Sequence, residues 1–191
     1  MRIQVAGGLA LHRLTKANFC ELLVPVAHTL LLTGDCLRPG DPVNNKFSEY
    51  LKNNWNRVIY LPGGSEMRSP GIIRNNMINC EYRIQQQLGN EYTLYGLTYI
   101  PWWDTSLLNK EEDWLYNILT NDDTNIIIGS YGKIPEVALN GNIITTIQGD
   151  NNFNQFDYTK GPITNHRTCR DGHLRNDYNP KFTLEIPHIL S

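Results

Sequence analysis

Two loops in this sequence place acidic residues shortly after apolar runs. The run at residues 28–33 leads into Gly34 and Asp35, and the run at residues 57–61 leads into Pro62, Gly63, Gly64, Ser65 and Glu66. Loops at strand ends in α/β proteins project their side chains into a shared crevice, where ligands and catalytic groups gather. A carboxylate such as that of Asp35 offers the oxygen ligands that hard divalent cations prefer. The function therefore depends on which side chains the loops bring to this crevice.

Two other groups of residues have types that could do chemistry. His166, Cys169 and His173 are possible zinc ligands, but no fourth ligand is evident, and a polar loop with an isolated thiol is the favoured interpretation. Ser65 follows two glycines, as a nucleophile can. It lacks the Gly-x-Ser-x-Gly pattern because Met67 stands where the last glycine belongs, so a short turn is favoured.

Arginine and tryptophan residues offer binding rather than catalysis. The guanidinium groups of Arg167, Arg170 and Arg175 could hold a phosphate through two parallel hydrogen bonds. A solvated loop, in which they pair with Asp171 and Asp177, is favoured. Trp102 and Trp103 form either an exposed aromatic anchor for a partner, or one core residue and one residue at the rim of the crevice.

These residues must be positioned by strands and helices that alternate along the chain. The hydrophobic pattern predicts strands at residues 2–6, 28–33, 57–61, 126–128, 143–147, 153–158, 163–164 and 182–186. Residues 92–100 are predicted to be a strand pair, or one strand with a glycine kink. Helices are predicted at residues 42–55, 72–88 and 109–119. This order of elements favours an α/β layered fold.

Particular residues are expected to begin or end the helices. Pro42 suits the first turn of its helix, Gly89 is predicted to stop the second, and Asn109 is predicted to cap the third. Lys46, Glu49 and Lys52 are expected on the solvated face of the first helix.

Composition limits the classes of partner and location. The net charge is −2 with no long basic run, so no nucleic-acid partner is implied. No apolar stretch is long enough to span a bilayer. The four cysteines are widely spaced and suggest reduced thiols, mostly buried, in an intracellular (cytoplasmic) protein.

Several segments, in order, resemble the calcineurin-like metallophosphoesterase superfamily, in its short single-domain form. Strand 1–6 is followed by Leu32-Thr33-Gly34-Asp35, where the family has an apolar strand ending in Gly-Asp. The later matching segments are Pro62-Gly63-Gly64-Ser65-Glu66, Ile128-Gly129-Ser130-Tyr131, Gln148-Gly149-Asp150-Asn151-Asn152, Asn165-His166-Arg167-Thr168 and residues 179–186. The resemblance covers almost the whole chain. It implies one domain, residues 1–191, in which two mixed β-sheets pack face to face between helices.

The same resemblance implies where metal ligands would stand, and there the chain departs from the family. The family reaction uses two metal ions, held by His, Asp and Asn, that polarise the phosphoryl oxygens and activate a water. Those positions hold Gly8, Ala10, Asp35, Gly64, Ser65, Ser130, Asp150 and Asn152. Of the family's ligands only Asp35 is kept. A two-metal centre is therefore not expected, although Asp35 and Asp150 could hold a single Mg²⁺ or Mn²⁺ ion weakly.

The resemblance leads to three hypotheses. The first is a pseudoenzyme without catalytic residues or cofactor, serving a structural or protein-interaction role with a protein partner. This chain is rich in Asn and Ile, like compact members of the family that resemble those of large DNA viruses. This resemblance suggests a virion or assembly component. The second is a weakly active phosphoesterase that uses Asp35, Asp150 and Asn152 around one cation. The third is a binding module that holds a phosphate-bearing ligand through Arg167.

Overall fold

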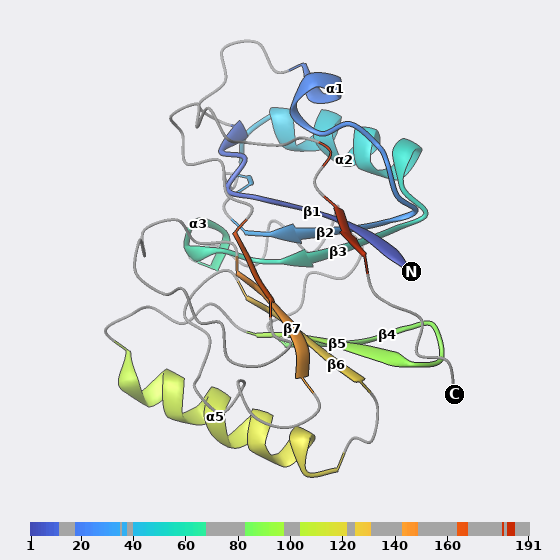
Figure 1. The fold of residues 1–191 in the computed structure, drawn as a ribbon. Coiled ribbons are helices and arrows are strands. Elements are labelled where there is room, and N and C mark those ends of the chain that lie inside the picture. Colours follow the sequence, from blue (N-terminus) through green and yellow to red (C-terminus); the bar gives the residue numbers. More distant parts are fainter. Residues whose placement is uncertain are drawn as a thin grey trace.

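The computed structural model describes residues 1–11, 18–34, 36–37, 40–67, 83–97, 104–121, 125–130, 143–148, 164–167, 181 and 183–185. Within them, strands and helices form an α/β architecture of stacked layers (Figure 1). The helices are α1 (Phe19–Leu22), α2 (Val43–Asn54), α3 (Gly64–Met67) and α5 (Thr105–Leu119). Helices α1 and α2 cover one side of the molecule and α5 the other, with two β-sheets between them.

The first sheet has the strand order β3-β2-β1-β9. Its strands are β1 (Arg2–Gly7), β2 (Thr29–Thr33), β3 (Arg57–Leu61) and β9 (Thr183–Glu185). The pairings of β1 with β2 and of β2 with β3 are parallel, whereas β9 is antiparallel to β1. The three parallel strands therefore have their carboxyl ends on the same edge of the sheet.

The second sheet has the strand order β4-β5-β6-β7-β8. Its strands are β4 (Ile84–Leu88), β5 (Tyr92–Gly96), β6 (Asn125–Ser130), β7 (Ile143–Gln148) and β8 (Thr164–Arg167). Strand β4 is antiparallel to β5, and the pairings from β5 to β8 are parallel. The structure thus confirms the predicted α/β class, with strands and helices arranged around two mixed sheets.

Two apolar clusters explain why the sheets are layered. Leu31 and Ile59 of the first sheet pack with Tyr92 and Leu94 of the second, so their cluster lies between the sheets. The other face of the first sheet packs against the helices, and this second cluster includes Leu30, Leu32, Phe47, Leu51 and Tyr60. Strand β2 thus faces apolar groups on both sides, which confirms the strand predicted from its continuous apolar run.

A buried amide ties the middle of β1 to the segment before β2 and to Trp55. Gln4 is fully buried, and its Oε1 accepts hydrogen bonds from Val26 N at 3.1 Å and from Trp55 Nε1 at 3.0 Å. Its Nε2 donates to the Val24 carbonyl at 2.7 Å. Since a buried polar group is costly unless it is paired, these bonds allow glutamine inside the core. They also fix the indole of Trp55.

Helix α2 agrees with its prediction, apart from the role of Pro42. This proline is the N-cap residue rather than part of the first turn, and the Asp41 Oδ1 atom accepts the Val43 N–H at 3.0 Å. Lys46 and Lys52 are exposed, as expected for the solvated face.

The predicted start of α5 was wrong. The helix begins at Thr105, and Asp104 caps it by accepting the Leu107 N–H at 2.9 Å. Asn109 lies inside the helix and is exposed. The earlier start follows from Asp104, which is among the best N-cap residues.

The helix predicted over residues 72–88 was wrong at its end. Ile84–Leu88 is strand β4, and residues 72–82 lie outside the described part of the chain. Gly89 opens the turn to β5 with φ of 71°, a left-handed conformation that glycine adopts readily. Pairing with β5 over five residues outweighs the helix propensity of the glutamines.

The remaining strand predictions were confirmed in their main positions. Strands β6, β7 and β9 overlap their predicted ranges, and β8 continues beyond its predicted end to Arg167. Strand β5 covers Tyr92–Gly96 and pairs with both β4 and β6, whereas residues 98–100 of the range predicted as a strand pair or a kinked strand lie outside the described residues. The strand predicted at residues 153–158 lies outside the described residues. Among the described helices, none has the length and apolar character needed to cross a membrane.

Candidate functional site at the carboxyl ends of the strands

The loops that follow β1 and β2 lie side by side. The Gly8 N–H donates to the Gly34 carbonyl at 2.8 Å, and the Leu11 N–H donates to the Cys36 carbonyl at 3.0 Å. These bonds continue the pairing of two parallel strands beyond the sheet edge. Two of the loops expected to meet in the crevice are therefore in direct contact.

The side chain of Glu66 joins the loop after β2 to the loop after β3. This carboxylate is fully buried, and its Oε1 accepts hydrogen bonds from Leu37 N at 3.1 Å and from the Tyr60 hydroxyl. Its Oε2 accepts the Gly63 N–H at 3.0 Å. Hydrogen bonds to a charged group are among the stronger ones, and they offset the cost of burying this carboxylate. Glu66 is therefore a clamp between two loops.

The second sheet reaches the same edge of the molecule. A methyl group on Gly129 would lie only 2.7 Å from Leu61 Cδ1, so the end of β6 contacts the end of β3. In the ladder from β6 to β8, Ser130 pairs with Gln148, and Gln148 pairs with Arg167. The carboxyl ends of strands in both sheets thus meet at one edge of the sandwich.

Left-handed backbone conformations are concentrated in the first two loops. Gly8 has φ of 56° and Gly34 has φ of 54°. Ala10 has φ of 46°, which costs about 1–2 kcal/mol for a residue with a Cβ atom. These values bend the two loops sharply just past the sheet edge.

The structure brings together several of the positions where metal ligands were expected. Gly8 and Ala10 lie in the loop after β1, and Gly64 and Ser65 lie in α3, directly after β3. Ser130 closes β6 in the second sheet. Asp35, Asp150 and Asn152 lie outside the described residues.

The described loop residues supply few groups for a metal ion. Gly8, Ala10 and Gly64 have no side-chain donor, and both carboxylate oxygens of Glu66 already accept hydrogen bonds. Within the described ranges, no group of three or more His, Cys, Asp or Glu residues could hold a metal ion. A single Mg²⁺ or Mn²⁺ ion on Asp35 and Asp150 stays a prediction, because neither residue belongs to those ranges.

The other predicted binding residues are only partly placed. Arg167 is the last residue of β8 at the carboxyl edge, and His166 precedes it. The other residues of these groups lie outside the described residues: Cys169, His173, Trp102 and Trp103. The zinc site and the aromatic patch therefore stay predictions.

The role of Glu66 was missed by sequence reasoning. Its position after two glycines marked the loop, but nothing local indicated that its partner would be the Leu37 backbone. Comparisons with protein-family models, curated proteins and solved structures gave no match to this chain.

Proposed function

We propose that this chain has a calcineurin-like phosphoesterase fold without two-metal catalysis and serves a structural or protein-interaction role. The observation that carries the proposal is the meeting of the loops after β1, β2 and β3 around positions that lack donors. Gly8 contacts the Gly34 loop directly, and Glu66 joins that loop to the segment containing Gly64. A two-metal centre needs side-chain ligands on both ions, and glycine supplies none.

The Glu66 clamp further supports a scaffold role. Loops in a metal centre can be held together by the ions themselves, because metal binding couples to folding. Here protein hydrogen bonds from Leu37, Tyr60 and Gly63 to Glu66 connect two of those loops. The loops can thus keep their arrangement without metal ions and present a fixed surface to a protein partner, as expected for a virion or assembly component.

Metal content and hydrolysis test this proposal directly. Protein purified without chelators would be analysed for bound metals, and hydrolysis of bis(p-nitrophenyl) phosphate would be measured with added Mn²⁺. We expect neither two metals per chain nor turnover above the metal-only control. Turnover that Asp35→Ala abolishes would instead support the weakly active phosphoesterase built on Asp35, Asp150 and Asn152. Two bound metals per chain would also overturn the proposal.

A phosphate-binding role is the second candidate, favoured by the position of Arg167. This residue ends β8 at the carboxyl edge, where the chain of paired strands runs through Gln148 to Ser130. Inorganic phosphate and nucleotides should then raise the melting temperature, since a ligand that binds only the folded state stabilises it. Arg167→Ala should remove the shift, with Arg57→Ala as a control at a distant arginine. No shift at high ligand concentration would reject this candidate.

A further inference from the structure

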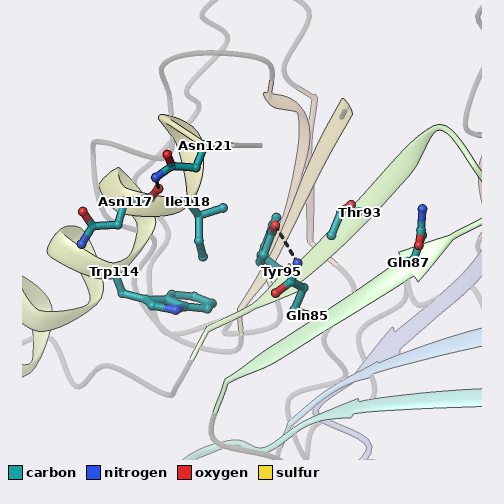
Figure 2. A pocket seen from close by; sticks show the side chains of 8 residues that line it. All are labelled: Gln85, Gln87, Thr93, Tyr95, Trp114, Asn117, Ile118 and Asn121. Carbon is teal, nitrogen blue, oxygen red and sulfur yellow. Dashed lines mark hydrogen bonds between the residues drawn. The ribbon is translucent and has the colours of Figure 1, made fainter. Parts of the chain in front are cut away.

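A groove lies on the outer side of the second sheet, between the β4–β5 hairpin and the second half of α5. Its volume is about 770 Å³, within the range of about 300–1,000 Å³ that is typical of small-ligand sites. Figure 2 shows Trp114 and Ile118 projecting from α5 toward the strand residues Tyr95 and Thr93. The helix leaves the carboxyl end of β5 and returns to the start of β6. Its second half therefore lies away from the candidate site described above.

The groove is lined by neutral hydrogen-bonding groups. Among the described residues that line it none is charged, and four carry primary amides: Gln85, Gln87, Asn117 and Asn121. A primary amide offers two donors and an acceptor, so it can either donate a hydrogen bond to a hydroxyl or accept one from it. Among the hydrogen bonds of the described residues, none uses the side-chain amide of Gln87 or Asn117. Gln85 Nε2 donates to the Tyr95 hydroxyl at 3.1 Å, and Asn121 Nδ2 donates to the Asn117 carbonyl at 2.6 Å.

The aromatic wall of the groove is held in position by its neighbours. The indole of Trp114 packs edge-on against Tyr95, with ring centroids 6.0 Å apart. The Arg83 guanidinium lies 4.9 Å from the centroid of the indole ring and pairs with the buried Glu111 carboxylate at 2.9 Å. A wall fixed before binding loses little entropy when a ligand arrives, which favours affinity.

We propose that this groove binds a neutral saccharide. Sugar hydroxyls donate and accept hydrogen bonds as the amides do, and a sugar ring has apolar C–H faces that can lie against Trp114. A charged ligand would find no opposite charge among the described lining residues, because the nearby Arg83 is already paired with Glu111. An apolar ligand would leave the amides unpaired when it displaced water. An extended peptide adding to the edge of β4 is disfavoured, because Arg57 Nη1 already donates to the Gln87 carbonyl at 3.0 Å.

Indole ¹⁵N–¹H NMR spectra of the full chain test the proposal. The panel would contain neutral mono- and disaccharides of gluco, galacto, manno and N-acetyl configuration. Inorganic phosphate, glucose 6-phosphate and an uncharged blocked tripeptide would serve as comparison ligands. We expect a saturable shift of the Trp114 indole signal, assigned with Trp114→Phe, for at least one neutral saccharide. The Trp55 signal should not move, because that indole is buried and bonded to Gln4.

Exposed groove residues provide variants that should not disturb folding. Gln87→Ala and Asn117→Ala should each weaken saccharide binding about threefold to tenfold, which corresponds to the loss of one hydrogen bond. Tyr116→Ala is the matched control, because Tyr116 lies on the same helix outside the groove lining and is 62% exposed. Its affinity should equal that of the unaltered chain.

Three results would overturn the proposal. The first is no saturable Trp114 shift with any neutral saccharide of the panel. The second is a shift only with the phosphate compounds or the tripeptide. The third is saccharide binding that Gln87→Ala and Asn117→Ala leave unchanged. The metal-content and hydrolysis assays do not involve this groove, so a failure here is distinguishable from a failure of the proposed function.

Discussion

The buried carboxylate of Glu66 accepts the backbone N–H of Leu37 at 3.1 Å and so joins two loops that follow different strands. The same carboxylate accepts hydrogen bonds from Tyr60 and Gly63. Donors from three places converge on one side chain at the edge where the parallel strands of the first sheet end. The stability of this edge should therefore depend strongly on Glu66.

Replacing Glu66 with glutamine tests the clamp at nearly constant volume. Glu66→Gln puts an amide nitrogen where a carboxylate oxygen accepts, and it removes the charge from the remaining bonds. We expect the free energy of unfolding to fall by about 2–3 kcal/mol, measured by urea denaturation. Glu49→Gln on the exposed face of α2 is the control and should change it by less than about 0.5 kcal/mol. Equal effects of the two substitutions would argue against the clamp.

Removal of divalent metal ions should leave the fold unchanged. Since protein hydrogen bonds to Glu66 connect the loops after β2 and β3, we expect the same melting temperature before and after dialysis against EDTA. The check is a thermal melt followed by circular dichroism. A melting temperature that falls with EDTA and recovers with Mn²⁺ would show that a metal ion stabilises the fold.

Glycine at position 10 should stabilise the chain. Ala10 has φ of 46°, and relief of about 1–2 kcal/mol of strain exceeds the entropic cost of glycine, about 0.5–1 kcal/mol. We therefore expect Ala10→Gly to raise the free energy of unfolding by about 0.5–1 kcal/mol. Ala27 has no positive φ, so Ala27→Gly relieves no strain and should lower the free energy of unfolding. Urea denaturation of both variants measures these changes. A lower free energy of unfolding in Ala10→Gly would contradict the assignment of strain to Ala10.

Tyr50 should make stability depend on pH in the alkaline range. Burial, and next the neighbouring side chain of Cys20, raise the pKa of Tyr50 from 10.0 to about 12. The Tyr50 hydroxyl donates to the Leu23 carbonyl at 2.7 Å. The folded state thus favours the neutral phenol. The contribution of Tyr50 to the free energy of unfolding is therefore fully present below pH 10 and is lost as the pH rises toward about 12. Tyr50→Phe should flatten this decline in urea midpoints measured across the range. The exposed Tyr116→Phe should leave it in place, and an identical decline in both variants would refute the assignment.

Much of the fold follows from local pattern. The continuous run Leu30-Leu31-Leu32 predicts a strand between two apolar layers, and all three residues are fully buried. The spacing of Phe47 and Leu51 predicts one apolar face of a helix, and both are buried in α2. These predictions succeed because burial of neighbouring residues is set by the periodicity of a single element.

Local pattern fails where a distant partner decides the conformation. The glutamines of β4 favour a helix on propensity, yet β5 recruits them into a hairpin. Asn109 was predicted as a cap because charged residues follow it, whereas Asp104 begins the helix earlier. In each case a competing signal nearby or across a turn outweighed the one that the prediction used.

By itself, the sequence determined the α/β class and most of the strands, and it shows that Gly8, Ala10 and Gly64 carry no side-chain donor. Only the tertiary structure decided that Glu66 clamps two of those loops, because its partner Leu37 is remote in sequence. Only the tertiary structure also placed Gln85 and Gln87 of β4 beside the second half of α5, where the groove lies. Residue types and periodicity are local properties, whereas hydrogen bonds and grooves depend on which elements pack side by side.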